Sequence, residues 1–108
     1  MPRGVRKTLR VYGWTAHFSD ENLGKRLGVP EWVAQCRAIV AATSKSEVAR
    51  LAGAGYPAKL FNLCETGNAV EIGIARAQPG RIFVAPIHGP VEANRFLKYD
   101  ADLYGRLC

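Results

Sequence analysis

Three stretches of the chain carry the hydrophobic pattern that is typical of β-strands. The first, Thr8–Phe18, is rich in β-branched and aromatic residues. The second, Cys36–Thr43, is a run of small apolar residues, and the third, Arg81–Ile87, is the most hydrophobic short run in the chain. Short apolar runs of this kind, bounded by polar or glycine-containing segments, predict buried strands. We expect the first two to pair side by side in one sheet.

The first predicted strand also has an alternating pattern. Leu9 and Val11 alternate with Arg10 and Tyr12. The alternation predicts that Leu9 and Val11 face the core while Arg10 and Tyr12 lie on the opposite face. Gly13 inside the strand indicates either a bulge or a close approach of another group to the backbone.

Helical spacing appears in the middle of the chain. Ser44 is a good N-cap, and Glu47 follows at the capping-box distance. Val48 and Leu51 lie on one side of this predicted helix, and Gly53 suits its C-terminal end.

A second helix of about two turns is predicted after this turn. Pro57 suits its first turn, and Leu60, Phe61 and Leu63 supply its apolar side. Together with the preceding helix it would form a helix-turn-helix-like corner. A third helix begins at Asn68, which has the spacing of a cap.

These elements predict an α+β fold. We expect a small, mainly antiparallel sheet of three strands, covered on one side by three short helices. Residues 8–98 form the single domain, residues 1–7 a basic flexible arm, and residues 99–108 a C-terminal strap or tail. The segment from Ser19 to Gln35 is predicted to be a long loop with one or two helical turns, and it offers a second contact surface through Lys25, Arg26 and Trp32.

The composition limits the classes of function. The 108 residues contain three cysteines without a CxxC pair, which favours a reduced compartment and argues against a disulfide framework or a zinc site. No apolar run is long enough to cross a bilayer and no leader is expected. No cofactor is predicted. The net charge of +6 favours a polyanionic partner, most simply nucleic acid.

The segment from Glu47 to Ala54 resembles the first helix and turn of the lactose-repressor family of DNA-binding proteins. The matching positions are Val48-Ala49 and Ala52-Gly53. The second helix departs from that family, because the expected apolar positions hold polar residues and Leu60 and Leu63 come one place later. The resemblance implies that a helix enters the major groove of DNA. On this interpretation Tyr56, Lys59 and Asn62 read bases, while Lys45, Arg50 and the arm residues Arg3, Arg6, Lys7 and Arg10 contact phosphates.

Most of residues 10–86 also resembles a class of small proteins from actinobacteriophages, especially mycobacteriophages. The shared patterns are RVYGW, IVAA-x-SK, EVARLAG and LFNLxETGN, which here span Arg10–Trp14, Ile39–Lys45, Glu47–Gly53 and Leu60–Asn68. The class has no activity that the resemblance could transfer. It implies a phage-encoded accessory protein in the host bacterial cytoplasm that binds DNA or a host protein.

Two other classes of function stay open in the sequence. Cys64 and His88 could pair as a nucleophile and a base, but no motif surrounds them, so we expect no enzyme activity. In a protein-binding module the anchors would be Trp14, Trp32, Tyr56 and Phe61, although a core position is favoured for Trp14 and Phe61. Self-association through a sheet edge or the third helix is a further possibility.

Overall fold

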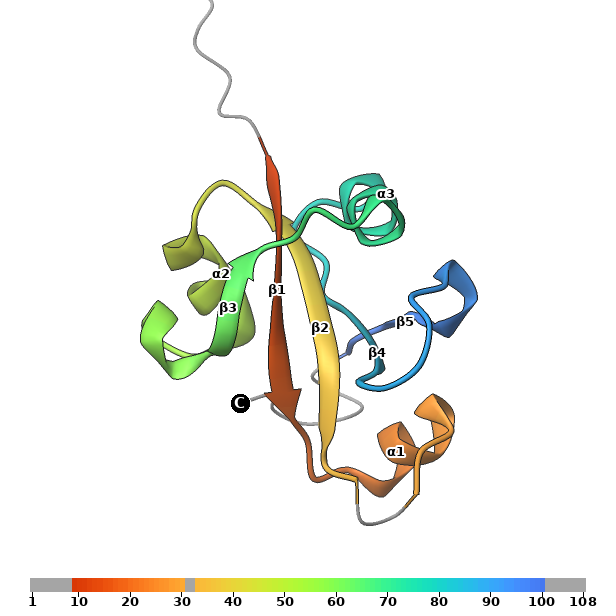
Figure 1. Ribbon diagram of the computed structural model, residues 1–108. Coiled ribbons are helices and arrows are strands. Elements are labelled where there is room, and N and C mark those ends of the chain that lie inside the picture. The colour runs from red at the N-terminus through yellow and green to blue at the C-terminus, as the bar shows by residue number, and fades with distance from the viewer. Residues whose placement is uncertain (1–8, 31–32, 101–108) are drawn as a thin grey trace, which may run out of the picture.

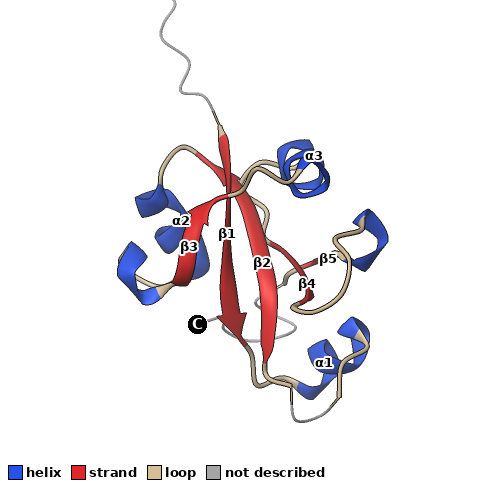
Figure 2. Cartoon of the chain, viewed as in Figure 1, coloured by secondary structure: helices blue, strands red, loops and turns tan. Residues whose placement is uncertain are grey.

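The computed structural model describes residues 9–30 and 33–100. These residues form one antiparallel sheet with α-helices on both of its faces (Figures 1 and 2). The strands are β1 (Arg10–His17), β2 (Gln35–Ala42), β3 (Phe61–Glu65), β4 (Phe83–Pro86) and β5 (Leu97–Lys98). The α-helices are α1 (Glu21–Leu27), α2 (Lys45–Ala52) and α3 (Ala69–Ala77), and two 3₁₀ turns are η1 (Pro57–Lys59) and η2 (Ala93–Arg95).

The sheet has the strand order β3-β1-β2-β4-β5, and every neighbouring pair is antiparallel. The α+β class and the mainly antiparallel sheet are therefore confirmed, and the first two predicted strands lie side by side as expected. The expected number of strands is wrong, since the described residues contain five rather than three. Both additional strands are short and lie toward the edges of the sheet, where β3 pairs only with β1 and β5 only with β4.

The helices cover two faces of the sheet instead of one. The larger core joins Tyr12, Trp14 and Val40 of the sheet to apolar residues of α1 and α2. The smaller core, on the other face, joins Val11 and other odd-numbered strand residues to α3. Tyr12, predicted to face away from the core, is only 5% exposed, because β1 is covered on both faces.

The helix boundaries follow their caps. The Ser44 hydroxyl accepts the Glu47 N–H at 3.1 Å, and Gly53 ends α2 with a left-handed φ of 74°. The Asn68 side chain accepts from the first turn of α3 in the same way. Helix α1 begins after Asp20, because the Asp20 carboxylate accepts the backbone N–H groups of Asn22 and Leu23.

The predicted second helix of the helix-turn-helix corner is not formed. Pro57 opens only a 3₁₀ turn, and the chain then enters β3. Leu60 and Leu63 both contact the larger core. Two apolar residues three positions apart on one side of the chain have the spacing of a helix, which is why a helix was predicted here. A bulge explains how a strand does this, because two β3 residues lie between partners that are separated by one residue on β1. Asn62 occupies the bulge with a φ of 58°, a conformation that asparagine tolerates better than most residues.

The two predicted terminal segments lie mostly outside the described residues. The arm, residues 1–7, is outside them entirely. Of the predicted strap, residues 99–108, the structure describes Tyr99 and Asp100. Tyr99 is 8% exposed and its N–H donates to the Ile82 carbonyl at 2.8 Å.

Candidate nucleic-acid interface

The three residues predicted to read bases are exposed but do not share a helix. Tyr56 precedes η1, Lys59 ends it, and Asn62 lies in the bulge of β3. Tyr56 is 55% exposed, and the Lys59 ammonium lies over its ring at 5.2 Å from the centroid. Base reading in the major groove by a recognition helix needs several side chains on one helical face. This segment has no such face.

A different set of cations gathers at one end of the sheet. Arg10 starts β1 directly opposite Ala42, the last residue of β2. Lys45 begins α2 three residues after Ala42, and Arg81 follows Gly80, whose N–H donates to the Ala41 carbonyl. The Arg76 guanidinium, at the end of α3, donates to the Leu9 carbonyl at 3.1 Å. We call these four exposed residues, Arg10, Lys45, Arg76 and Arg81, the basic end.

Figure 1 shows why this convergence occurs. Strand β1 starts, strand β2 ends, and α2 and α3 lie to either side at the same end of the sheet. Sequence reasoning identified Arg10 and Lys45 but not Arg76 and Arg81, which come from segments predicted as separate elements. The sequence contained no local signal for them, because only the register of the sheet places them together.

Much of the positive charge at the basic end is available to a ligand. Within the described part of the chain, neither Lys45 nor Arg81 makes a side-chain hydrogen bond or ion pair. Arg10 approaches Glu65 at 3.8 Å, but both side chains are more than half exposed, so the pair is weak. Arg50 lies further along α2 and pairs with Glu47 at 3.5 Å.

The Glu47 carboxylate has local partners of its own. It accepts from the Thr43 backbone N–H at 2.8 Å, and this bond contributes most to a pKa below the usual range of glutamate. The carboxylate is therefore ionised at neutral pH and stabilises the start of α2. It partly offsets Arg50 but leaves Lys45 without an ion pair.

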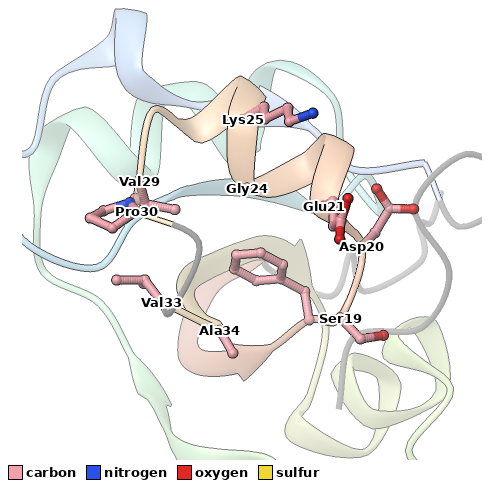
Figure 3. A pocket seen from close by; sticks show the side chains of 10 residues that line it. Ser19, Asp20, Glu21, Gly24, Lys25, Val29, Pro30, Val33 and Ala34 are labelled. Carbon is pink, nitrogen blue, oxygen red and sulfur yellow. The ribbon is translucent and has the colours of Figure 1, made fainter.

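The predicted second contact surface lies at the opposite end of the sheet. Lys25 and Arg26 are exposed in the last turn of α1, and Trp32 lies outside the described residues. Lys25 borders a pocket of about 450 Å³ (Figure 3). In Figure 3, Asp20 and Glu21 lie on one side of this pocket and Val29, Pro30 and Val33 on the other. The Asp20 carboxylate already caps α1, and the structure assigns no ligand to the pocket.

A buried ionic network on the α3 face of the sheet was missed by sequence reasoning. Glu71, 2% exposed, accepts two hydrogen bonds from the Arg37 guanidinium, at 2.9 and 3.0 Å. The Thr66 hydroxyl donates a third at 2.7 Å. The guanidinium lies over Gly13, where a Cβ atom would fall 2.8 Å from Arg37 Nη1 and still closer to Cζ and Nη2. Gly13 was the one available signal, since it indicated a close approach to the backbone.

The network fixes the charge states of both partners. Burial alone would raise the pKa of Glu71, but hydrogen bonds from Arg37 and Thr66 and the Arg37 charge outweigh it and lower the pKa. The hydrogen bond to Glu71 raises the pKa of Arg37. The pair is ionised at neutral pH, and Arg37 is held in one orientation.

The cysteines differ in accessibility. Cys36 is buried, and burial raises the pKa of its thiol to about 12, so it is a neutral core residue at neutral pH. Cys64 is exposed on β3. Among residues 9–30 and 33–100, no group of three or more histidine, cysteine or carboxylate side chains is placed to hold a metal ion. None of the helices in these ranges has the length and apolar character needed to cross a bilayer.

Comparison of the chain with protein-family models, curated proteins and solved structures gives no match.

Proposed function

We propose that this protein binds nucleic acid, with the basic end of the sheet as its phosphate-contacting surface. The observation that supports this most strongly is the convergence of Arg10, Lys45, Arg76 and Arg81 from four separate elements. In keeping with the sequence resemblance, we propose that it is a phage-encoded accessory protein acting in the host bacterial cytoplasm.

The chemistry of the basic end favours a phosphate backbone. Exposed lysine and arginine side chains gain affinity for nucleic acid mainly by releasing condensed counterions. The predicted arm adds Arg3, Arg6 and Lys7, which precede β1 in the sequence and so join the chain at this end. The proposal does not include base recognition by Tyr56, Lys59 and Asn62, because the helix that would present them is not formed.

Salt dependence of binding tests the proposal. A labelled duplex and a labelled single strand are each titrated at several salt concentrations, and the logarithm of the affinity is plotted against the logarithm of the salt concentration. Phosphate contacts by the four residues of the basic end alone predict a slope of about −2.8 to −3.6, because each contributes roughly −0.7 to −0.9. No binding of either ligand at low salt would overturn the proposal.

A pair of double variants locates the surface. Lys45→Gln with Arg81→Gln removes two cations that have no side-chain partner in the described structure, so folding should be retained. The slope should become shallower by roughly 1.4–1.8. The matched control, Lys25→Gln with Arg26→Gln, removes the same charge from α1 at the other end of the sheet. It should change the slope by less than about 0.4, which is half the contribution of one phosphate contact. Equal effects of the two double variants would contradict a localised basic end.

A host bacterial protein is the second candidate partner. Its supporting observation is the exposed Tyr56 ring with Lys59 over it, since tyrosine in such a position is frequent at protein interfaces. A pull-down from nuclease-treated bacterial lysate, with Tyr56→Ala as the comparison, tests this candidate. One partner recovered by the wild type and lost with the variant would support it, and identical recovery would count against this surface.

A further inference from the structure

We infer that the open part of the α3 face of the sheet, a row of side chains from Phe61 to Ala85, binds the bases of single-stranded nucleic acid. This inference rests on the proposed function, because it needs the basic end to hold the phosphates. It goes further by naming the form of nucleic acid and the side chains that contact its bases. The row contains Phe61, Thr15, Arg37 and Ala85.

The strand register places the row on one line across the sheet. Phe61 of β3 pairs with Thr15 of β1, Thr15 pairs with Arg37 of β2, and Arg37 pairs with Ala85 of β4. Residues that are directly opposite in neighbouring strands point to the same face. The four side chains therefore project from the same face of four adjacent strands.

Cover over this row is incomplete: Ala85 is 5% exposed and Glu71 of α3 contacts Arg37, but the row opens toward Phe61. Ile39 and Phe83, one pleat nearer the basic end on the same face, pack with Ala75 of α3 in the smaller core. In the open row, by contrast, Phe61 is 58% exposed, and it has the greatest exposure of the large hydrophobic residues in the described structure. The next pair on this face, His17 and Gln35, is also exposed, and their side chains contact one another at 3.1 Å.

The chemistry of the row suits a base better than an apolar protein segment. An exposed aromatic ring on a sheet face stacks on unpaired bases and tolerates any base. Beside it lie hydrogen-bonding groups, namely the Thr15 hydroxyl, the Gln35 amide and the Arg37 guanidinium. A helical segment of a partner protein would meet these polar groups in the centre of the contact, where they would have to be satisfied.

Arg37 is held ready for such a contact. Glu71 engages its Nε and Nη2 atoms, and Arg37 Nη1 has no hydrogen-bond partner in the described residues. The side chain is 28% exposed and lines a pocket of about 290 Å³ together with Glu71 and apolar residues of the segment from Ala85 to Phe96. The second N–H of Nη2 and one N–H of Nη1 form the other edge of the guanidinium, and such a parallel pair matches the O6 and N7 acceptors of guanine. We therefore expect guanine to be preferred at this position.

The charge and spacing allow one single-stranded nucleic acid to contact both the basic end and the open row. Glu71 is the one carboxylate among the pocket-lining residues, and Arg37 neutralises it. Thr15 lies five positions after Arg10 on β1, a distance of about 17 Å at the usual rise of a strand. The net charge of the chain, +6, has the sign that such a ligand requires.

The test compares Phe61→Ala with the wild type on a labelled single-stranded oligonucleotide that contains guanines and on the duplex of the same sequence. The single strand should lose roughly five- to 150-fold in affinity, which corresponds to about 1–3 kcal/mol for one stacked base. The salt slope should not change, because no phosphate contact is removed. Phe61→Trp should retain the wild-type affinity, and Tyr56→Ala is the matched control for an exposed aromatic residue outside the row.

The outcomes separate this inference from the proposed function. If binding is salt-dependent but neither Phe61→Ala nor Tyr56→Ala changes the affinity, the inference is overturned. The proposed phosphate contacts at the basic end would still be supported. Binding of the duplex as tightly as the single strand would overturn it as well. No binding by the wild type at low salt would overturn both. A wild-type preference for guanine-containing over thymine-only single strands, lost with Arg37→Lys, supports Arg37 as the contact to the base.

Discussion

Replacing Glu71 with glutamine should destabilise the protein by about 2–3 kcal/mol. The change removes the charge from an acceptor of three hydrogen bonds, two from Arg37 and one from Thr66. Hydrogen bonds to charged groups contribute roughly 1.5–3 kcal/mol each, but the glutamine oxygen still accepts part of them. The loss is also smaller than for a fully buried pair, because Arg37 is 28% exposed and water can solvate it.

Denaturant unfolding at pH 7 measures this loss, and the melting temperature should fall by about 10 °C. Glu65→Gln is the matched control, because its partner Arg10 is 3.8 Å away and both side chains are largely exposed. The control should change the free energy of unfolding by less than about 0.5 kcal/mol. Equal, small effects of the two substitutions would refute the view that the Arg37–Glu71 pair supports the fold.

The difference between the wild type and Glu71→Gln should depend on pH. The folded-state pKa of Glu71 is lowered, so its contribution is fully present above the unfolded value of about 4.3. The contribution is lost as the pH falls through the folded-state pKa, because both states are then protonated. The two unfolding free energies should therefore converge in acid. A difference that stays constant between pH 7 and pH 3 would show that the carboxylate charge is not responsible.

Three further substitutions or reagents test individual parts of the structure. Gly13→Ala should displace the Arg37 guanidinium and lower the free energy of unfolding by about 2 kcal/mol. The loss should be smaller in a protein that already carries Glu71→Gln. Additive losses of the two substitutions in denaturant unfolding would contradict the close contact. Asn62→Ala should cost roughly 1–2 kcal/mol because of the left-handed backbone, whereas Asn62→Gly should be nearly neutral; equal melting temperatures would argue against the bulge. A thiol reagent should label Cys64 rapidly in the native state and Cys36 only on unfolding, since Cys36 is buried with a pKa raised to about 12; rapid labelling of both in a peptide-mapped time course would contradict this burial.

Local sequence patterns predicted the elements in which the pattern matches the structure that forms. Strands β1 and β2 follow apolar runs, and α2 and α3 start at the side-chain caps Ser44 and Asn68. Each of these features depends on residues within a few positions of one another. The sequence therefore contains enough information to place them.

Strand β3 shows why a correct pattern can give the wrong element. Leu60 and Leu63 are three residues apart and share one side, which is the spacing of a helix. In the structure the bulge at Asn62 produces the same arrangement in a strand. Phe61, predicted to lie in the core, is consequently exposed on the opposite face. The helix-turn-helix interpretation depended on this one assignment.

The candidate surfaces depend on long-range pairing that no local pattern encodes. Arg37 and Glu71 are 34 positions apart, and Arg76 reaches the Leu9 carbonyl across 67 positions. The open row joins residues from four strands. Phe61 and Ala85 enter it only because β3 pairs with β1 and β4 pairs with β2 in the observed register. From the sequence, the charge of the protein predicted a polyanionic partner, but the location of the surface required the fold.

A residue-resolved NMR titration with a short guanine-containing single strand tests the central claim most directly. The amides around the basic end, Arg10, Lys45, Arg76 and Arg81, and around the row from Phe61 to Ala85 should shift together on binding. The amides of α1 should shift little and provide the internal reference. Shifts concentrated on α1 or around Tyr56, or no shifts at low salt, would contradict nucleic-acid binding at the surface described here.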